Sequence, residues 1–89
     1  MKYIVLYRPN SEHATEVETY LHDFEPQIPP EVSINILSLD TREGADTAAL
    51  YDIVQYPGML VTTDDGVPLQ IWSGPMLPLK NEVASYFHG

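Results

Sequence analysis

Two strand-like segments joined by one helical segment, all within the first forty residues, constrain the fold of this chain more than any other feature. Lys2–Tyr7 is rich in β-branched and aromatic residues, and Val32–Leu39 opens with alternating apolar residues, so both segments are predicted to be strands. Between them, apolar residues recur at helical spacing, at Ala14, Val17, Leu21 and Phe24. Because strands joined by a crossover helix pair in parallel, the first half predicts a right-handed β-α-β unit.

The ends of this first helix are marked by residues that favour or prevent helix formation. Asn10 or Ser11 is expected to cap its start, since either side chain can accept a hydrogen bond from a free helix amide. Pro26, Pro29 and Pro30 are expected to end it, because proline lacks the amide hydrogen that a helix interior requires.

A second helix is predicted directly after the second strand. Asp40–Glu43 resembles a capping box, although Gly44 weakens this start and favours a helix that begins nearer Asp46. The apolar positions expected to face the core are Ala45, Ala48, Ala49, Leu50 and Ile53.

The last forty residues predict a hairpin and a final helix. Met59–Thr63 and Val67–Trp72 are expected to be antiparallel strands, joined by a tight turn at Asp64–Gly66. The final helix is marked by apolar residues at Leu79, Val83 and Phe87. The order β-α-β-α-β-β-α predicts an α/β fold with a four-stranded mixed sheet and helices on both faces. We expect the third strand to run antiparallel to the first, and the first and last helices to share a face. Residues 1–89 suit one domain with one modest core.

The charge of the chain argues against two classes of partner. Thirteen acidic residues face only four basic ones, which gives a net charge of −9. Nucleic acids and anionic lipids would repel such a surface, so neither is an expected partner. No apolar run is long enough to span a membrane, and Met1–Lys2 leads into a strand instead of a signal peptide, so a cytoplasmic protein is expected.

The second half also contains a series of family-like residues. In order and spacing, these residues resemble a stretch of the thioredoxin/glutaredoxin superfamily: Tyr51–Pro57, followed directly by Gly58–Val61, and then Gly66 and Gly74. The resemblance covers almost the whole chain. It implies a thioredoxin-like fold in which the Tyr56–Pro57 bond is cis and the backbone of the preceding residue pairs with an extended peptide or with glutathione.

The chain departs from this superfamily at its redox centre. Where glutaredoxin-like members have Pro-x-Cys-x-x-Cys, this sequence has Pro9–Ala14, and the two cysteine positions fall on Ser11 and Ala14. The chain contains no cysteine, which excludes disulfide exchange, thiolate nucleophiles and thiol-based metal sites. His13 and Glu16 lie at a spacing compatible with one helix face, but no second histidine accompanies them. No catalytic residue, metal or cofactor is therefore expected.

The remaining candidate site is a groove around the expected cis-proline, and its predicted binding residues are Arg8, Ser11, Tyr56, Pro57 and Trp72. Arg8 is one of few basic residues and suits an acidic group on a partner, while Tyr56 suits apolar contact. Trp72 is out of phase with the alternating residues of its strand. It either lies partly exposed beside Tyr56 or packs in the core on the second sheet face.

These features favour a redox-inactive module that binds a protein or extended peptide through the cis-proline groove. Two alternatives remain open: a glutathione-type ligand site in the same groove, and a degenerate glutaredoxin-like or glutathione-transferase-like enzyme that uses the Ser11 hydroxyl. The sequence leaves the identity of the partner and the oligomeric state open.

Overall fold

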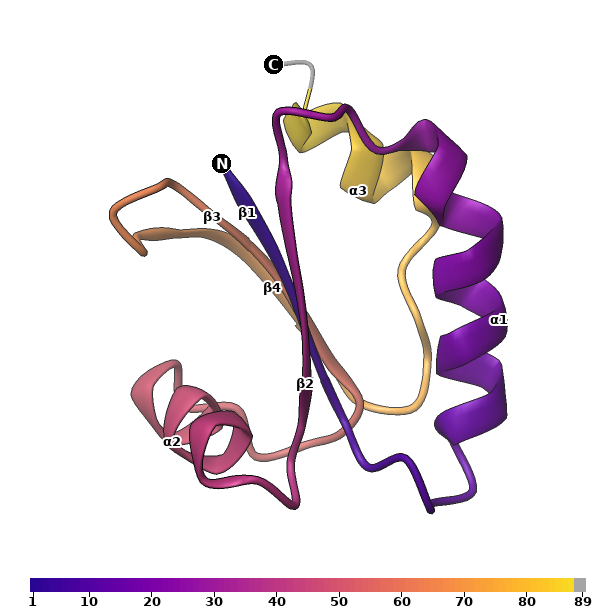
Figure 1. Ribbon diagram of the computed structural model, residues 1–89, viewed down its shortest axis with the longest axis vertical. Helices are drawn as coiled ribbons and strands as arrows, with labels where there is room; N and C mark the ends of the chain where they lie inside the picture. Colours follow the sequence, from indigo (N-terminus) through magenta and orange to yellow (C-terminus); the bar gives the residue numbers. More distant parts are fainter. Residues whose placement is uncertain (88–89) are drawn as a thin grey trace.

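The sheet of the protein has four strands. The structure is a computed structural model, and it describes residues 1–87. The strands are β1 (Lys2–Tyr7), β2 (Ser33–Ser38), β3 (Gly58–Thr62) and β4 (Pro68–Ser73). Their order across the sheet is β2-β1-β3-β4 (Figure 1). β1 pairs in parallel with β2 and antiparallel with β3, and β3 pairs antiparallel with β4. The predicted mixed sheet is confirmed, with strand ends that differ from the expected ones by about one residue.

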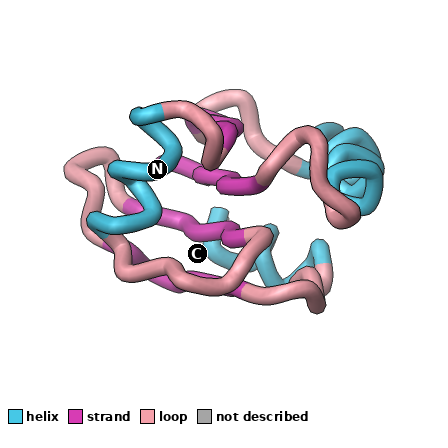
Figure 2. The backbone as a smooth tube through the Cα atoms, turned by 90° about the horizontal axis from the view of Figure 1, so that it is seen from below, coloured by secondary structure: helices cyan, strands magenta, loops and turns pink. Residues whose placement is uncertain are grey.

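Three helices enclose this sheet, namely α1 (Ala14–Phe24), α2 (Arg42–Leu50) and α3 (Lys80–Phe87). A short 3-10 helix, Glu25–Gln27, follows α1 and contains Pro26, so the prolines end α1 as expected. α1 and α3 lie on one side of the sheet and α2 on the other (Figure 1), and Figure 2 shows the strands between these helical segments. The predictions of helices on both faces, and of a shared face for the first and last helices, are confirmed.

The alternating residues of β1 divide the interior into two cores. Tyr3, Val5 and Tyr7 pack with α1 and α3, whereas Ile4 and Leu6 pack on the α2 side. β1 and β3 are central strands with almost wholly buried side chains, as expected of strands covered on both faces. β2 and β4 form the two edges of the sheet and are more exposed.

The start of α1 differs from the prediction. The helix begins at Ala14, and its N-cap residue, His13, makes no side-chain capping hydrogen bond. Ser11 instead forms a turn before the helix, in which its carbonyl accepts a hydrogen bond from the Ala14 amide at 3.2 Å. The prediction that Asn10 or Ser11 caps the helix is therefore wrong, because this turn separates both residues from the first free helix amides.

The start of α2 also needs correction. The helix begins at Arg42, and the Thr41 hydroxyl accepts a hydrogen bond from the Gly44 amide at 3.1 Å. A start nearer Asp46 is therefore wrong, since Thr41 caps the helix three residues before Gly44. The core-facing side is also narrower than predicted, because Ala48 and the following Ile53 are buried while Ala45, Ala49 and Leu50 are exposed.

The last helix is shorter than its apolar spacing suggests. α3 begins at Lys80, and Leu79 lies before it with 70 % of its surface exposed. The Leu79 carbonyl accepts hydrogen bonds from the amides of Glu82 and Val83, so Leu79 contributes backbone contacts in place of the expected packing. Val83 is fully buried and Phe87 packs against the same core, as predicted.

Candidate functional site

Arg8 lies just beyond the carboxyl end of β1, where the chain leaves the sheet. Its guanidinium Nη1 donates a hydrogen bond to Asp40 Oδ1 at 3.0 Å, and each side chain is about half exposed. Asp40 follows β2, so this ion pair links the carboxyl ends of the two parallel strands. Arg8 is accessible, but a partner would meet a guanidinium that already has an acidic neighbour.

The turn that follows Arg8 is closed by its own hydrogen bonds. The Ser11 hydroxyl donates to the Arg8 carbonyl at 2.6 Å, and the Arg8 amide donates to His13 Nε2 at 3.2 Å. The Ser11 hydroxyl thus faces a carbonyl oxygen instead of helix amides, and His13 is occupied with the backbone. These contacts give both residues a structural role in shaping the turn.

The Tyr56–Pro57 segment lies at the entrance to β3. The bond between the two residues is cis, which confirms that prediction. Pro57 is buried, and its carbonyl accepts a hydrogen bond from the Gly74 amide at 3.1 Å. Within residues 1–87, the backbone amide and carbonyl of Tyr56 make no hydrogen bond. Both backbone groups of Tyr56 are therefore unpaired in the described part of the chain.

Trp72 lies on the opposite face of the sheet from Tyr56. Its indole Nε1 donates to Glu82 Oε1 at 2.9 Å, and its ring meets that of Tyr86 edge-on at 5.7 Å. Trp72 packs against the α1 and α3 core, whereas Tyr56 packs against the α2 core. Of the two expectations for Trp72, core packing on the second face is the observed one. The structure does not place it beside Tyr56.

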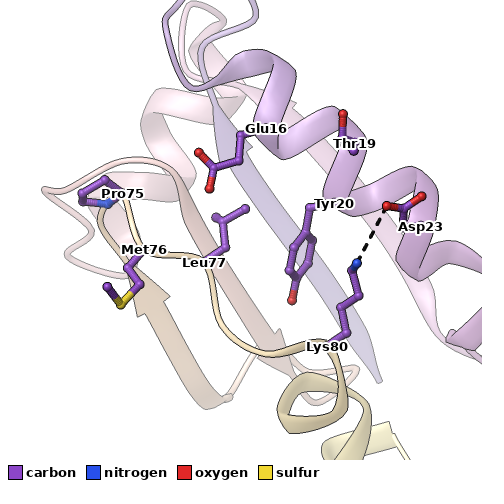
Figure 3. Close-up of a pocket in the computed structure, with 8 residues that line it drawn as sticks. All are labelled: Glu16, Thr19, Tyr20, Asp23, Pro75, Met76, Leu77 and Lys80. Carbon is purple, nitrogen blue, oxygen red and sulfur yellow. Dashed lines mark ion pairs between the residues drawn. The ribbon is translucent and has the colours of Figure 1, made fainter.

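A groove that the sequence analysis missed adjoins the Pro57 segment. It has a volume of about 730 Å³ and lies between α1 and the loop from β4 to α3 (Figure 3). Its lining residues are Glu16, Thr19, Tyr20, Asp23, Pro75, Met76, Leu77 and Lys80. The loop side begins next to Gly74, whose φ of +108° favours glycine and whose amide is bound to Pro57. The groove and the Tyr56–Pro57 segment thus meet at one end of the sheet.

The groove combines an aromatic wall with an acidic rim. The Tyr20 hydroxyl donates to the Pro78 carbonyl at 2.8 Å, which holds the loop against α1. Burial, and to a lesser extent the nearby Glu82 carboxylate, raises the pKa of Tyr20 to about 12, so its hydroxyl stays protonated at neutral pH. Lys80 Nζ lies 3.9 Å from Asp23 and 5.4 Å from the Tyr20 ring centroid. Met76 is 89 % exposed at the mouth.

Sequence reasoning missed this groove because its two sides come from segments more than fifty residues apart. Tyr20 and Asp23 belong to a helix face, and Pro75–Leu77 to a loop, so neither segment alone indicates a cavity. The one signal in the sequence was Met76, a methionine that lies between two prolines in that loop.

The described part of the chain offers no metal centre and no membrane span. No three His, Cys, Asp or Glu side chains of residues 1–87 gather closely enough to hold a metal ion. None of the helices between Met1 and Phe87 has the length and hydropathy needed to cross a bilayer.

Comparisons with known proteins identify the fold. No protein-family model matches the chain, and no curated protein sequence matches it significantly. Among solved structures, a designed protein matches with a TM-score of 0.68 at 20 % identity, covering 94 % of this chain and 73 % of the designed chain. Thioredoxin 1 from the thermophilic eubacterium Thermosipho africanus TCF52B matches with a TM-score of 0.61 at 11 % identity, covering 99 % of this chain and 91 % of that thioredoxin. The chain therefore has a thioredoxin-like fold, and it lacks the cysteines that thiol–disulfide chemistry requires.

Proposed function

We propose that this domain binds an extended segment of another protein at the Tyr56–Pro57 edge and the adjoining groove. The observation that supports this function best is the pair of free backbone groups on Tyr56, located beside a groove of about 730 Å³. An extended peptide can donate to and accept from such groups in the manner of an added strand. This mode of binding needs no cysteine, so it is compatible with the missing redox centre.

The groove supplies contacts for the side chains of such a segment. Tyr20 offers an aromatic wall, and the flexible thioether of Met76 adapts to different apolar partners. Tyr56 adds a half-buried ring that packs on the α2 side of the sheet, at the end of the sheet where its free backbone groups lie. Arg8, half exposed beside Asp40, is the candidate contact for an acidic group on the segment.

Selection of peptides provides a direct test. A library of random linear peptides displayed on phage should yield binders to the intact chain. For those binders, Tyr56→Ala, Met76→Glu and Arg8→Glu should each raise Kd at least tenfold, equivalent to about 1.4 kcal/mol. Ser85→Ala, an exposed change on α3, should leave Kd unchanged.

Two results would contradict the proposal. Binders that tolerate all three groove changes would place the peptide site elsewhere. A rise in unfolding temperature with glutathione, abolished by Tyr56→Ala, would instead assign the groove to a glutathione-type ligand. The Ser11 hydroxyl, engaged by the Arg8 carbonyl at 2.6 Å, gives no support to an enzyme that uses it.

A further inference from the structure

The two edges of the sheet differ in how well they are protected against pairing with another strand. β4 begins with a proline, Pro68, and its pairing with β3 is interrupted between Val61 and Thr62. β2 contains neither proline nor a charged residue, and its register with β1 is regular over six residues. Natural edge strands are usually blunted by charges, prolines or bulges, because unpaired backbone groups attract further strands. By these criteria β2 is an open edge.

The backbone groups exposed along β2 can be assigned to particular residues. The Ser33 amide donates to Met1 at 3.0 Å, and the Leu39 amide donates to Tyr7 at 2.9 Å, so the odd-numbered residues pair with β1. Successive residues of a strand turn their amides and carbonyls to opposite sides. Ile34 and Ile36 therefore direct both groups to the free edge of the sheet.

Side chains on both faces of the sheet flank this edge. On the α1 face lies a hollow of about 420 Å³, lined by Leu21, His22, Glu25, Ile28, Ile34 and Ile36. Ile34 and Ile36 are 40 % and 50 % exposed there. On the α2 face lies a smaller hollow of about 210 Å³, whose lining is partly apolar and carries both signs of charge: Lys2, Ile4, Asn35, Leu37, Glu43 and Thr47. An added strand would thus meet mainly apolar side chains on the α1 face, and on the α2 face a mixed surface in which Glu43 is the one acidic group.

Charge decides which kind of strand fits. The chain has a net charge of −9, and three of its four basic residues form ion pairs with its own carboxylates, at Arg8, Arg42 and Lys80. The fourth, Lys2, lines the α2-face hollow together with Glu43, and Glu25 lines the hollow on the α1 face, so carboxylates flank the β2 edge on both faces. A second copy of the chain also has a net charge of −9 and would be repelled from this surface, whereas a basic segment would be attracted to it.

We propose that the β2 edge binds an extended segment of another protein in which apolar and basic residues alternate. Its apolar side chains lie against Ile34 and Ile36 on the α1 face, and its basic side chains face Glu43. This surface is separate from the Tyr56–Pro57 site, so either assignment can fail without the other.

A short synthetic peptide tests this inference on the unaltered chain. The probe is an acetylated and amidated peptide of alternating lysine and valine, and the matched control has the same sequence with N-methylated valines. Both peptides have the same charge, but the control lacks the amide donors that would face β2. The unmodified peptide should protect the Ile34 and Ile36 amides from hydrogen exchange and leave the bonded Asn35 and Leu37 amides unchanged. The control should bind at least tenfold more weakly.

A variant of the protein provides a second arm. Ile36→Pro removes one outward amide and leaves the bonds between β2 and β1 in place, so it should weaken binding at least tenfold. Equal affinity for the two peptides would show charge attraction alone and would overturn the proposal, whether or not the variant folds. A dimer of the free chain, detected by sedimentation and abolished by Ile36→Pro, would also overturn it by assigning the edge to a second copy.

Discussion

Tyr20 shows how one side chain links two distant segments. Its ring packs at 5.8 Å from that of Phe24, and its hydroxyl donates to the Pro78 carbonyl at 2.8 Å. The hydroxyl thus anchors the loop that leads into α3, and with it one side of the groove. A partly buried hydroxyl needs such a partner, because leaving it unpaired away from water costs more free energy than the hydrogen bond contributes when it forms.

Replacing Tyr20 with phenylalanine should lower the free energy of unfolding by about 1 kcal/mol at neutral pH, since it removes this hydrogen bond. Above pH 10 the difference in the free energy of unfolding between the unaltered protein and the variant should become smaller. The folded state raises the pKa of Tyr20 from its usual 10.0 to about 12, so the unfolded chain loses this proton first. The native protein therefore loses stability between these two values, whereas the variant has no such group. Urea denaturation at neutral pH and at about pH 11 measures both effects. A difference in the free energy of unfolding that increases at high pH would contradict the raised pKa of Tyr20 in the folded state.

At the scale of elements, α2 is positioned by a glycine. A Cβ at Gly44 would lie far inside contact distance of the Ser38 carbonyl oxygen and 2.7 Å from its carbon. Gly44 therefore allows α2 to approach the end of β2, and its amide donates a hydrogen bond to the capping Thr41 hydroxyl. What the sequence presents as a weak helix start is a requirement of close packing.

Gly44→Ala distinguishes local preference from packing. In an isolated helix this change stabilises by up to about 1 kcal/mol. Here it should destabilise the protein by about 1–3 kcal/mol, because the backbone of Ser38 has to move. Ala45→Gly, an exposed change in the same turn, is the matched control and should cost only about 1 kcal/mol through lost helix propensity. Chemical denaturation of the two variants measures the contrast, and a more stable Gly44→Ala protein would disprove the packing argument.

At the scale of the whole molecule, charge is poorly balanced. The ion pairs among residues 1–87 are few and lie at the surface, as Arg8–Asp40 and Arg42–Asp46 illustrate. Pairs of this kind contribute little to stability. We therefore expect repulsion among the thirteen acidic residues to be the larger electrostatic effect in the folded state.

Added salt should consequently stabilise the protein. Raising ionic strength from 0.01 M to 0.15 M shortens the Debye length from about 30 Å to about 8 Å and screens this repulsion. The urea midpoint should therefore increase with sodium chloride at neutral pH. A decrease would show that the surface ion pairs outweigh the repulsion.

The sequence by itself determined the order of elements and the absence of thiol chemistry. Strand and helix periodicity are local patterns, and the β-α-β rule converts them into a parallel pair, so the mixed sheet and the shared face of α1 and α3 follow. The same local evidence separated Trp72 from its alternating neighbours, and in the structure Trp72 is partly buried against the α1 and α3 core, on the opposite face from Tyr56.

Only the tertiary structure decided which residues meet. In the folded chain the Ser11 hydroxyl donates to the Arg8 carbonyl, and close packing requires glycine at position 44. The groove lined by Tyr20 and Met76 forms beside Pro57. Local propensity extends over a few residues, whereas these contacts join segments brought together by burial of two cores. The separation between such segments is set by side-chain packing across the sheet, and no pattern within either segment encodes it.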